Sequence, residues 1–174
     1  RPDLEELYQE GADFLADLEA YVGNFDEAIA LCEKVKRFRP KDAWANYELG
    51  QVYYLRGDLK KASAELVEAV DLNPRYLDAY LLLGQLQLEQ GNHSKALTYY
   101  QKALELDPSH PTALFKAAQI LNELGDHEEA KKYARKRLED DRHNIPTLIE
   151  LARSFQLAGD HERALSQYEE ILAL

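Results

Sequence analysis

The stretch GDLKKA at residues 57–62 decides the fold, because its glycine, acidic residue and alanine return at a fixed interval. The glycine recurs every 34 residues, is followed each time by Asn or Asp, and precedes an alanine by five positions. The five glycines are Gly23, Gly57, Gly91, Gly125 and Gly159, and the five alanines are Ala28, Ala62, Ala96, Ala130 and Ala164. A period of this length is typical of stacked helix–turn–helix repeats. The chain is therefore expected to form a quasi-linear stack of helix pairs rather than one globule.

The unit at residues 43–76 shows how one repeat is built. Apolar residues at helical spacing predict a first helix, helix A, over residues 43–56. Gly57 is expected to end this helix, because glycine adopts the left-handed conformation of a C-terminal cap without steric cost. Asp58 is expected to begin the second helix, helix B, by offering its carboxylate to the free backbone amides.

Proline marks the end of helix B. Helix B of this unit is expected to run to about Leu72, because Asn73 precedes Pro74 and proline donates no backbone hydrogen bond. Pro40 and Pro108 repeat the same stop.

Two further local patterns support the repeat. Capping boxes are expected where Asn24 precedes Glu27 and where Asp126 precedes Glu129, each at the spacing of three residues. Small residues occupy the eighth repeat position, counted from Ala43, and predict a close helix crossing there. These residues are Ala16, Gly50, Gly84, Ala118 and Ala152.

These residues resemble the tetratricopeptide repeat family. The second repeat matches the family pattern at Leu49, Gly50, Tyr53, Gly57, Asp58, Ala62, Ala69 and Pro74, and the third matches at Tyr80, Leu83, Gly84, Gly91, Ala96, Tyr100, Ala103 and Pro108. The resemblance implies an all-α, right-handed superhelical solenoid of tandem helix–turn–helix units. It also implies that helix A of each repeat lines a concave groove and helix B forms the convex back.

The period divides the chain into one solenoid domain of five repeats. The predicted segments are an N-terminal helical extension or the end of a preceding repeat at 1–8, and repeats at 9–42, 43–76, 77–110, 111–144 and 145–174, the last of them truncated at its end.

Composition narrows the function. The net charge of −11 repels phosphate backbones, so nucleic acid is not expected as a partner. No apolar stretch reaches the length of a membrane-spanning helix, so no direct membrane insertion is expected. The single cysteine, Cys32, lies on an apolar helical stripe and is expected to be buried. No cofactor is expected, and cytoplasm is the favoured compartment, with the periplasm left open.

The histidines do not indicate a metal site. His93, His127 and His161 recur at one repeat position, where other repeats carry Phe25 and Leu59. Packed helices lie about 8–10 Å apart, whereas zinc ligands bind at about 2.0–2.1 Å from one ion. The position is therefore interpreted as a packing site, and the chain as a non-enzyme.

The functional prediction concerns the face of helix A opposite its core stripe. An ordinary surface helix is polar there, but this face carries an apolar row beside an amide row, which favours a peptide-binding groove. The groove candidates are Tyr47, Gln51, Tyr54, Leu81, Gln85, Leu88, Phe115, Gln119, Asn122, Ile149 and Arg153.

Charge along this face suggests the kind of ligand. Asp13 and Asp17 make the first repeat acidic, whereas Arg153 lies at the other end. Of the basic residues that the family uses to grip acidic chaperone tails, only Lys116 is present, so such a clamp is not expected. The expected ligand is an amphipathic helix or an extended apolar segment of a partner protein.

A basic cluster in the fourth repeat has two interpretations. It consists of Lys131, Lys132, Arg135 and Lys136 on the convex side, and Arg137 extends it. One interpretation is a solvated face with ion pairs such as Glu128 to Lys132. The other is a secondary docking patch for an acidic partner.

Three functional interpretations stay open on the residues alone. The first is a scaffold or adaptor that holds a partner peptide in the groove. The second is an assembly module that stacks on further repeats or on a second copy, for which the apolar residues Ile171, Leu172 and Leu174 at the uncapped C-terminal end are candidates. The third is a regulatory domain of a larger enzyme.

Overall fold

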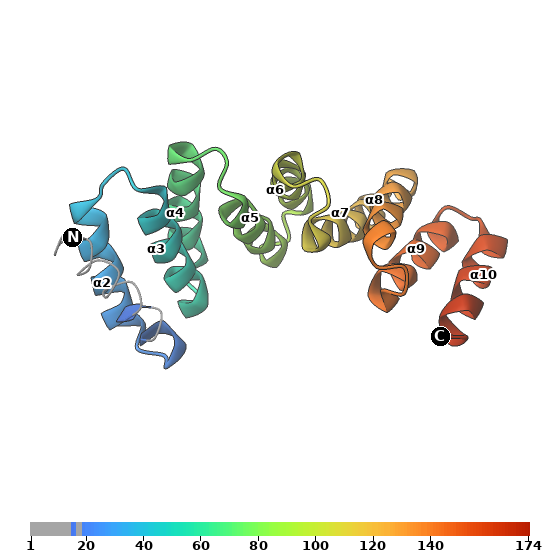
Figure 1. Cartoon of the computed structure of the whole chain (residues 1–174), viewed down its shortest axis with the longest axis horizontal. Coiled ribbons are helices and arrows are strands. Elements are labelled where there is room, and N and C mark those ends of the chain that lie inside the picture. The colour runs from blue at the N-terminus through green and yellow to red at the C-terminus, as the bar shows by residue number, and fades with distance from the viewer. Residues whose placement is uncertain (1–14, 17–18) are drawn as a thin grey trace. The chain divides into compact units, whose positions relative to one another are not determined.

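The computed structural model describes residues 15–16 and 19–174, and this part of the chain is helical without strands (Figure 1). Its helices are α2 (Phe25–Phe38), α3 (Ala43–Arg56), α4 (Leu59–Leu72), α5 (Leu77–Glu89), α6 (His93–Leu106), α7 (Pro111–Leu124), α8 (His127–Asp140), α9 (Ile145–Leu157) and α10 (His161–Leu172). The predicted extension at 1–8 and the acidic pair Asp13 and Asp17 lie outside the described residues.

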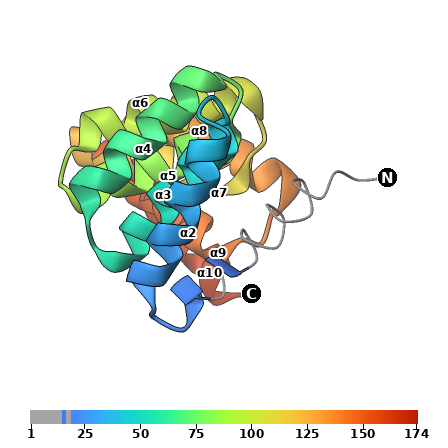
Figure 2. The ribbon, with the colours of Figure 1, turned by 90° about the vertical axis from the view of Figure 1, so that its left-hand side faces the viewer.

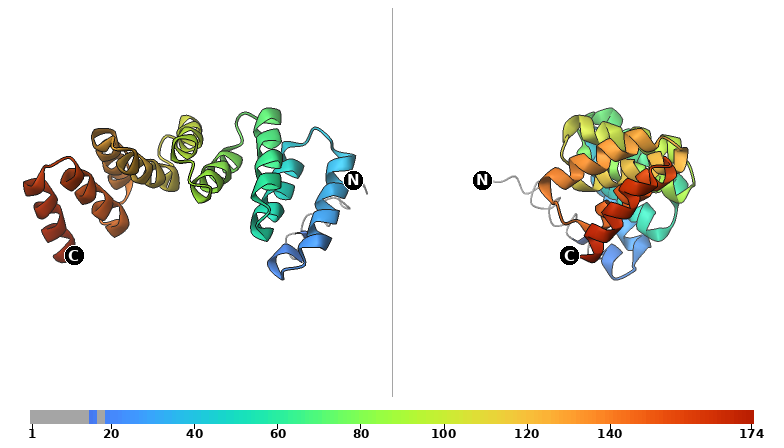
Figure 3. Two further views of the ribbon diagram at one scale, coloured as in Figure 1. Left: turned by 180° about the vertical axis from the view of Figure 1, so that it is seen from behind. Right: turned by 90° about the vertical axis from the view of Figure 1, so that its right-hand side faces the viewer.

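The chain divides into two compact units, one ending at Leu86 and one beginning at Gln87. In the first unit α2 packs against α3, and α3 packs against α4; α2 faces the viewer in Figure 2. In the second unit each helix from α6 to α10 packs against the next, and α9 and α10 run side by side (Figure 3). Helix α7 also contacts α9 directly. The first helices of two successive repeats therefore form one continuous surface within the second unit.

The predicted helix ends are confirmed. All five glycines of the ladder have positive φ, between 73° and 90°. At the end of α3 the amide of Asp58 donates to the carbonyl of Tyr53 at 2.9 Å, and at the end of α7 the amide of Asp126 donates to Leu121 at 2.8 Å. These bonds satisfy carbonyls that a helix end leaves without partners. Helix α4 ends at Leu72, before Asn73 and Pro74, as expected.

The predicted N-terminal caps are correct in only some repeats. The carboxylates of Asp126 and Asp160 accept from the backbone amides of Glu129 and Arg163, at 3.3 Å and 3.2 Å. The cap at Asp58 is wrong, because its carboxylate instead accepts from the guanidinium of Arg56, whose Nε lies 3.0 Å away. A charged donor binds a carboxylate more strongly than neutral amides do.

The capping box at Asn24 is also wrong. The Asn24 side chain makes no cap hydrogen bond. Its amide nitrogen instead donates to Glu19 at 2.6 Å.

The close helix crossing predicted at Gly50 is confirmed. A Cβ atom on Gly50 would lie 2.8 Å from Cγ of Leu66, which is fully buried on α4. Atoms at that distance clash, so only glycine allows α3 and α4 to pack this closely. Leu49 on α3 and Ala62 on α4 are buried as well.

The core of the second unit lies between α7, α8, α9 and α10. It consists of Ala118, Ala134, Leu151, Phe155 and Ala164, with Tyr133, Leu138 and Tyr168 packed against it. Alanines on three helices pack around the large Leu151 and Phe155. The opposite side of α9 is thereby left outside this core.

Candidate functional site

The clearest exposed apolar surface among the groove candidates lies on α9. Ile149 is 44% exposed, and Ile145, one helical turn earlier, is 47% exposed. Arg153 follows one turn later on the same side, because residues four apart lie above one another on a helix. The opposite side of α9 is buried through Leu148, Leu151, Ala152 and Phe155. This helix is therefore apolar on both sides, and one of those sides faces solvent.

Helix α7 extends this surface with half-buried candidates. Phe115 and Gln119 occupy the repeat positions equivalent to Ile149 and Arg153 on the neighbouring helix that α7 contacts. The ammonium of Lys116 lies 6.0 Å from the centroid of the Phe115 ring. We name the surface made by Phe115, Gln119, Ile149 and Arg153 the α7–α9 face.

The candidates of the first unit are half-buried on α3. Tyr47, Gln51 and Tyr54 recur along the helix, and the Tyr47 ring packs against Tyr76 with centroids 4.9 Å apart. Desolvation, followed by the proximity of Tyr47, raises the pKa of the Tyr76 phenol above its ordinary range. The phenol therefore stays neutral and its apolar ring is available for packing.

The candidates on α5 are also half-buried. Leu81 and Gln85 belong to the first unit, and Leu88 belongs to the second.

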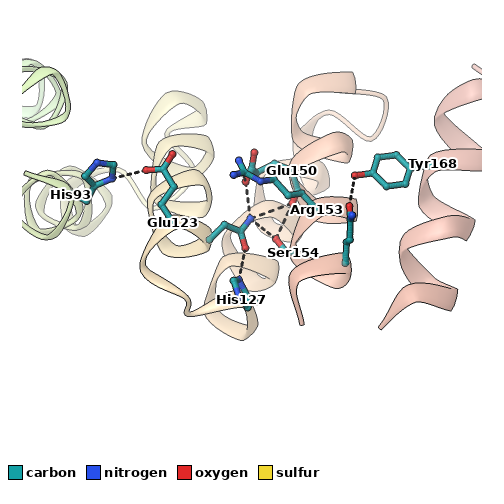
Figure 4. A network of polar contacts seen from close by, with 9 residues as sticks. His93, Glu123, His127, Glu150, Arg153, Ser154 and Tyr168 are labelled. Atoms are coloured by element: carbon teal, nitrogen blue, oxygen red, sulfur yellow. Dashed lines mark hydrogen bonds and ion pairs between the residues drawn. The ribbon is translucent and has the colours of Figure 1, made fainter. Parts of the chain in front are cut away.

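The expectation that Asn122 lines an exposed groove is wrong. Its side chain is buried, and Nδ2 donates to Glu150 Oε1 at 2.7 Å and to Ser154 Oγ at 2.8 Å. Figure 4 labels both of these partners. On its other side, Asn122 Oδ1 lies 3.2 Å from Nδ1 of His127. Because Asn122 is on α7 and both Glu150 and Ser154 are on α9, the amide holds these two helices together. Asn122 does lie on the first helix of its repeat, α7, but α9 of the following repeat covers its side chain.

This polar network is the feature that sequence reasoning missed. Glu150 is only 4% exposed, and the guanidinium of Arg153 lies 3.8 Å from its Oε1. Buried carboxylates need hydrogen-bond donors or a paired charge, and here Asn122 and Arg153 supply both. This ion pair restrains the side chain of Arg153, which is one of the groove candidates. The sequence does contain a sign of this network, because Glu150 interrupts an apolar stretch of α9.

The basic cluster of the fourth repeat is not uniformly exposed. Lys131 is buried and pairs with Glu128 at 2.6 Å, so its place on an exposed patch is wrong. Lys132 is exposed and pairs with Glu129 at 2.5 Å, in place of the predicted pair with Glu128. Arg135 and Lys136 are exposed.

The repeated histidines lie at the starts of α6, α8 and α10. His93 Nδ1 is 2.5 Å from Glu123 Oε2, and His127 contacts Asn122 (Figure 4). Within residues 15–16 and 19–174, no group of three or more His, Cys, Asp or Glu side chains is placed to hold a metal ion. Cys32 is buried, as predicted. No helix in that same part of the chain is both long enough and apolar enough to cross a membrane.

The described helices and their glycine-capped turns define an all-α helical repeat protein. A family model described as tetratricopeptide repeat matches residues 15–76, 47–111 and 81–142, and a second model of the same description matches residues 146–170. The chain belongs to the tetratricopeptide repeat family. Repeats of this architecture present extended surfaces that bind other proteins.

Solved structures share this fold. The MamA protein is 21% identical with a TM-score of 0.85, over 95% of this chain and 90% of that one. MamA 41-end from Desulfovibrio magneticus RS-1 is 17% identical with a TM-score of 0.83, over 95% of this chain and 94% of that one. YrrB, described as a TPR protein with an unusual peptide-binding site, is 22% identical with a TM-score of 0.82, over 93% of this chain and 84% of that one. A search of curated protein sequences gave no significant match.

Proposed function

We propose that this chain is a non-catalytic scaffold that binds a peptide or helix of a partner protein on the exposed side of its A helices. The main support for this proposal is that Ile145 and Ile149 are exposed on α9, on the side opposite the core. Exposed apolar residues in a row are a usual mark of a protein-binding surface. The peptide-binding site in the description of YrrB, a protein of the same fold, agrees with this proposal.

The α7–α9 face has side chains suited to bind an apolar segment through both its side chains and its backbone. Phe115 and Ile149 offer apolar contacts, and the Gln119 amide can both donate to and accept from a peptide backbone. Arg153 adds a positive charge that is held in place by Glu150. The ligand class is therefore an amphipathic helix or an extended apolar segment, not an acidic chaperone tail.

The test begins with selection of binding peptides from a random library displayed on phage. Affinity of a selected peptide is then compared for wild type, Ile149→Asp and Leu124→Asp. The control is matched, because Leu124 is 46% exposed against 44% for Ile149. It lies nine residues after Phe115 on α7, which places it on the opposite side of a helix with 3.6 residues per turn.

The proposal expects Ile149→Asp to weaken binding by about tenfold or more, because the bound peptide would bury a carboxylate where wild type buries an apolar side chain. Leu124→Asp is expected to leave affinity unchanged. Equal losses in both variants, or a loss only in Leu124→Asp, would reject the α7–α9 face. Circular dichroism of each variant establishes that the helices are intact.

A second candidate function, self-assembly, rests on α10. Leu165 lies in the middle of this helix and is 60% exposed, and Leu172 is 87% exposed one heptad later. A second copy that covers this side would bury both leucines. Sedimentation velocity would then show a dimer that Leu165→Glu dissociates, whereas a monomer at all concentrations rules this candidate out.

A further inference from the structure

Three cationic side chains converge on one buried aromatic ring in the second unit. The ammonium of Lys131 lies 4.9 Å from the centroid of the Phe155 ring, the guanidinium carbon of Arg135 lies 5.5 Å from it, and that of Arg163 lies 5.8 Å from it. Lys131 and Arg135 are on α8, Phe155 is on α9 and Arg163 is on α10. We name this group the Phe155 cation cluster.

The three cations differ in how far their charges are already neutralised. Lys131 is buried and forms an ion pair with Glu128, which neutralises its charge. Arg163 has a side chain that is 68% exposed and directs Nε toward Asp160 at 3.4 Å. Arg135 is exposed, and among the described residues it forms no ion pair within 4.0 Å.

Cation–π attraction explains why the three cations gather at this ring. It leaves the N–H donors of the arginines unused. The ring attracts each cation through its quadrupole, and this attraction consumes no N–H donor. Two guanidinium groups beside one ring also repel each other, and an anion between them removes that repulsion. The unused planar N–H groups of arginine match the two oxygens of a carboxylate.

We propose that the Phe155 cation cluster is a second docking site, distinct from the α7–α9 face, for an acidic segment of a partner protein. Carboxylates of that segment bind the guanidinium groups of Arg135 and Arg163, while the Phe155 ring holds these groups in position. The net charge of the chain favours a short acidic peptide over nucleic acid as the ligand. The chain carries a net charge of −11, which repels a long phosphate backbone more than it repels a few carboxylates.

The structure also corrects which residues form such a site. The sequence placed a basic patch along α8 alone, at Lys131, Lys132, Arg135 and Lys136. Lys132 is paired with Glu129. Arg163, from the following repeat and absent from that prediction, contacts the same ring as Arg135.

The test measures binding of a fluorescein-labelled hexaglutamate peptide by fluorescence anisotropy at low salt, with hexalysine as the charge-reversed probe. The variant is Arg135→Gln with Arg163→Gln. The matched control is Lys60→Gln with Lys95→Gln, because both lysines are exposed and the change in net charge is the same. Thermal unfolding of both variants checks that each is folded.

The proposal expects wild type to bind hexaglutamate, added salt to weaken that binding, and the arginine variant to weaken it about tenfold or more. The lysine control is expected to stay within about twofold of wild type. Replacing both arginines by lysine is expected to retain part of the affinity, because charge is kept and the planar donor pair is lost. Absence of binding by wild type, or equal weakening in both glutamine variants, would overturn the proposal.

Discussion

At the scale of single residues, glycine does two different jobs in this chain. The ladder glycines have left-handed backbone conformations, whereas Gly50 lies inside a helix and allows a close contact with Leu66. The same substitution, glycine to alanine, therefore tests two separate physical causes.

Gly125→Ala is expected to destabilise the chain by about 1–2 kcal/mol, because a non-glycine residue is strained in the left-handed region. Space is not the reason, since nothing lies within 4 Å of the added Cβ. Gly125→Asn is expected to cost less, because asparagine tolerates this conformation. Urea unfolding measures both, and equal stability of wild type and the alanine variant would contradict the cap.

Gly50→Ala is expected to destabilise despite the better helix propensity of alanine. The propensity advantage is about 1 kcal/mol, whereas overpacking of a dense core costs about 1–3 kcal/mol. In a Leu66→Ala background the clash is gone, so Gly50→Ala is expected to become stabilising there. A double-mutant cycle with no coupling between the two positions would show that Leu66 is not the cause.

Tyr76 makes stability depend on pH at the alkaline end. Desolvation, then Tyr47 and Glu48, raise the pKa of Tyr76 above its ordinary value of 10.0. The folded chain keeps this proton where the unfolded chain has lost it, so the free energy of unfolding falls as pH rises above about 10. Tyr76→Phe removes the titrating group and is expected to give a flatter pH profile. Urea titrations at pH 8 to 11 compare the two, and parallel profiles would refute the effect.

At the scale of elements, the α7–α9 pair depends on a buried amide and carboxylate. Asn122→Leu removes an amide donor from the buried Glu150, and loss of a hydrogen bond to a charged group costs about 1.5–3 kcal/mol. Adding Glu150→Leu removes the stranded carboxylate, so the double variant is expected to be more stable than Asn122→Leu alone. Denaturant unfolding decides, and a double variant that is less stable than either single variant would contradict this account.

Particular residues show how much of the structure the sequence alone predicts. Helix ends and the crossing at Gly50 follow from local chemistry and from a 34-residue period, so they were predicted correctly. Asn122 and Lys131 were placed wrongly because their burial depends on Glu150 and Phe155, which come from the next repeat. Asp58 was placed wrongly for a nearer reason, since Arg56 competes for its carboxylate. Candidates Phe115, Gln119, Ile149 and Arg153 remain predictions of function.

At the scale of the whole molecule, the repeats produce two kinds of surface with different chemistry. The exposed side of the A helices combines apolar and amide groups, whereas the Phe155 cation cluster gathers basic side chains of the B helices α8 and α10 around a ring of α9 within an acidic chain. We propose that these two surfaces bind two partner segments of different character, and the division follows from the alternation of helices in each repeat.

Isoleucine methyl NMR tests the central claim most directly. The chain has five isoleucines, of which Ile145 and Ile149 are on the exposed side of α9, Ile120 is buried on α7, and Ile29 and Ile171 lie on other helices. A peptide selected for binding to this chain is expected to shift the methyl signals of Ile145 and Ile149 and to leave that of Ile171 unchanged. Shifts at Ile171 with none at Ile145 or Ile149 would place the ligand elsewhere and contradict binding on the A helices.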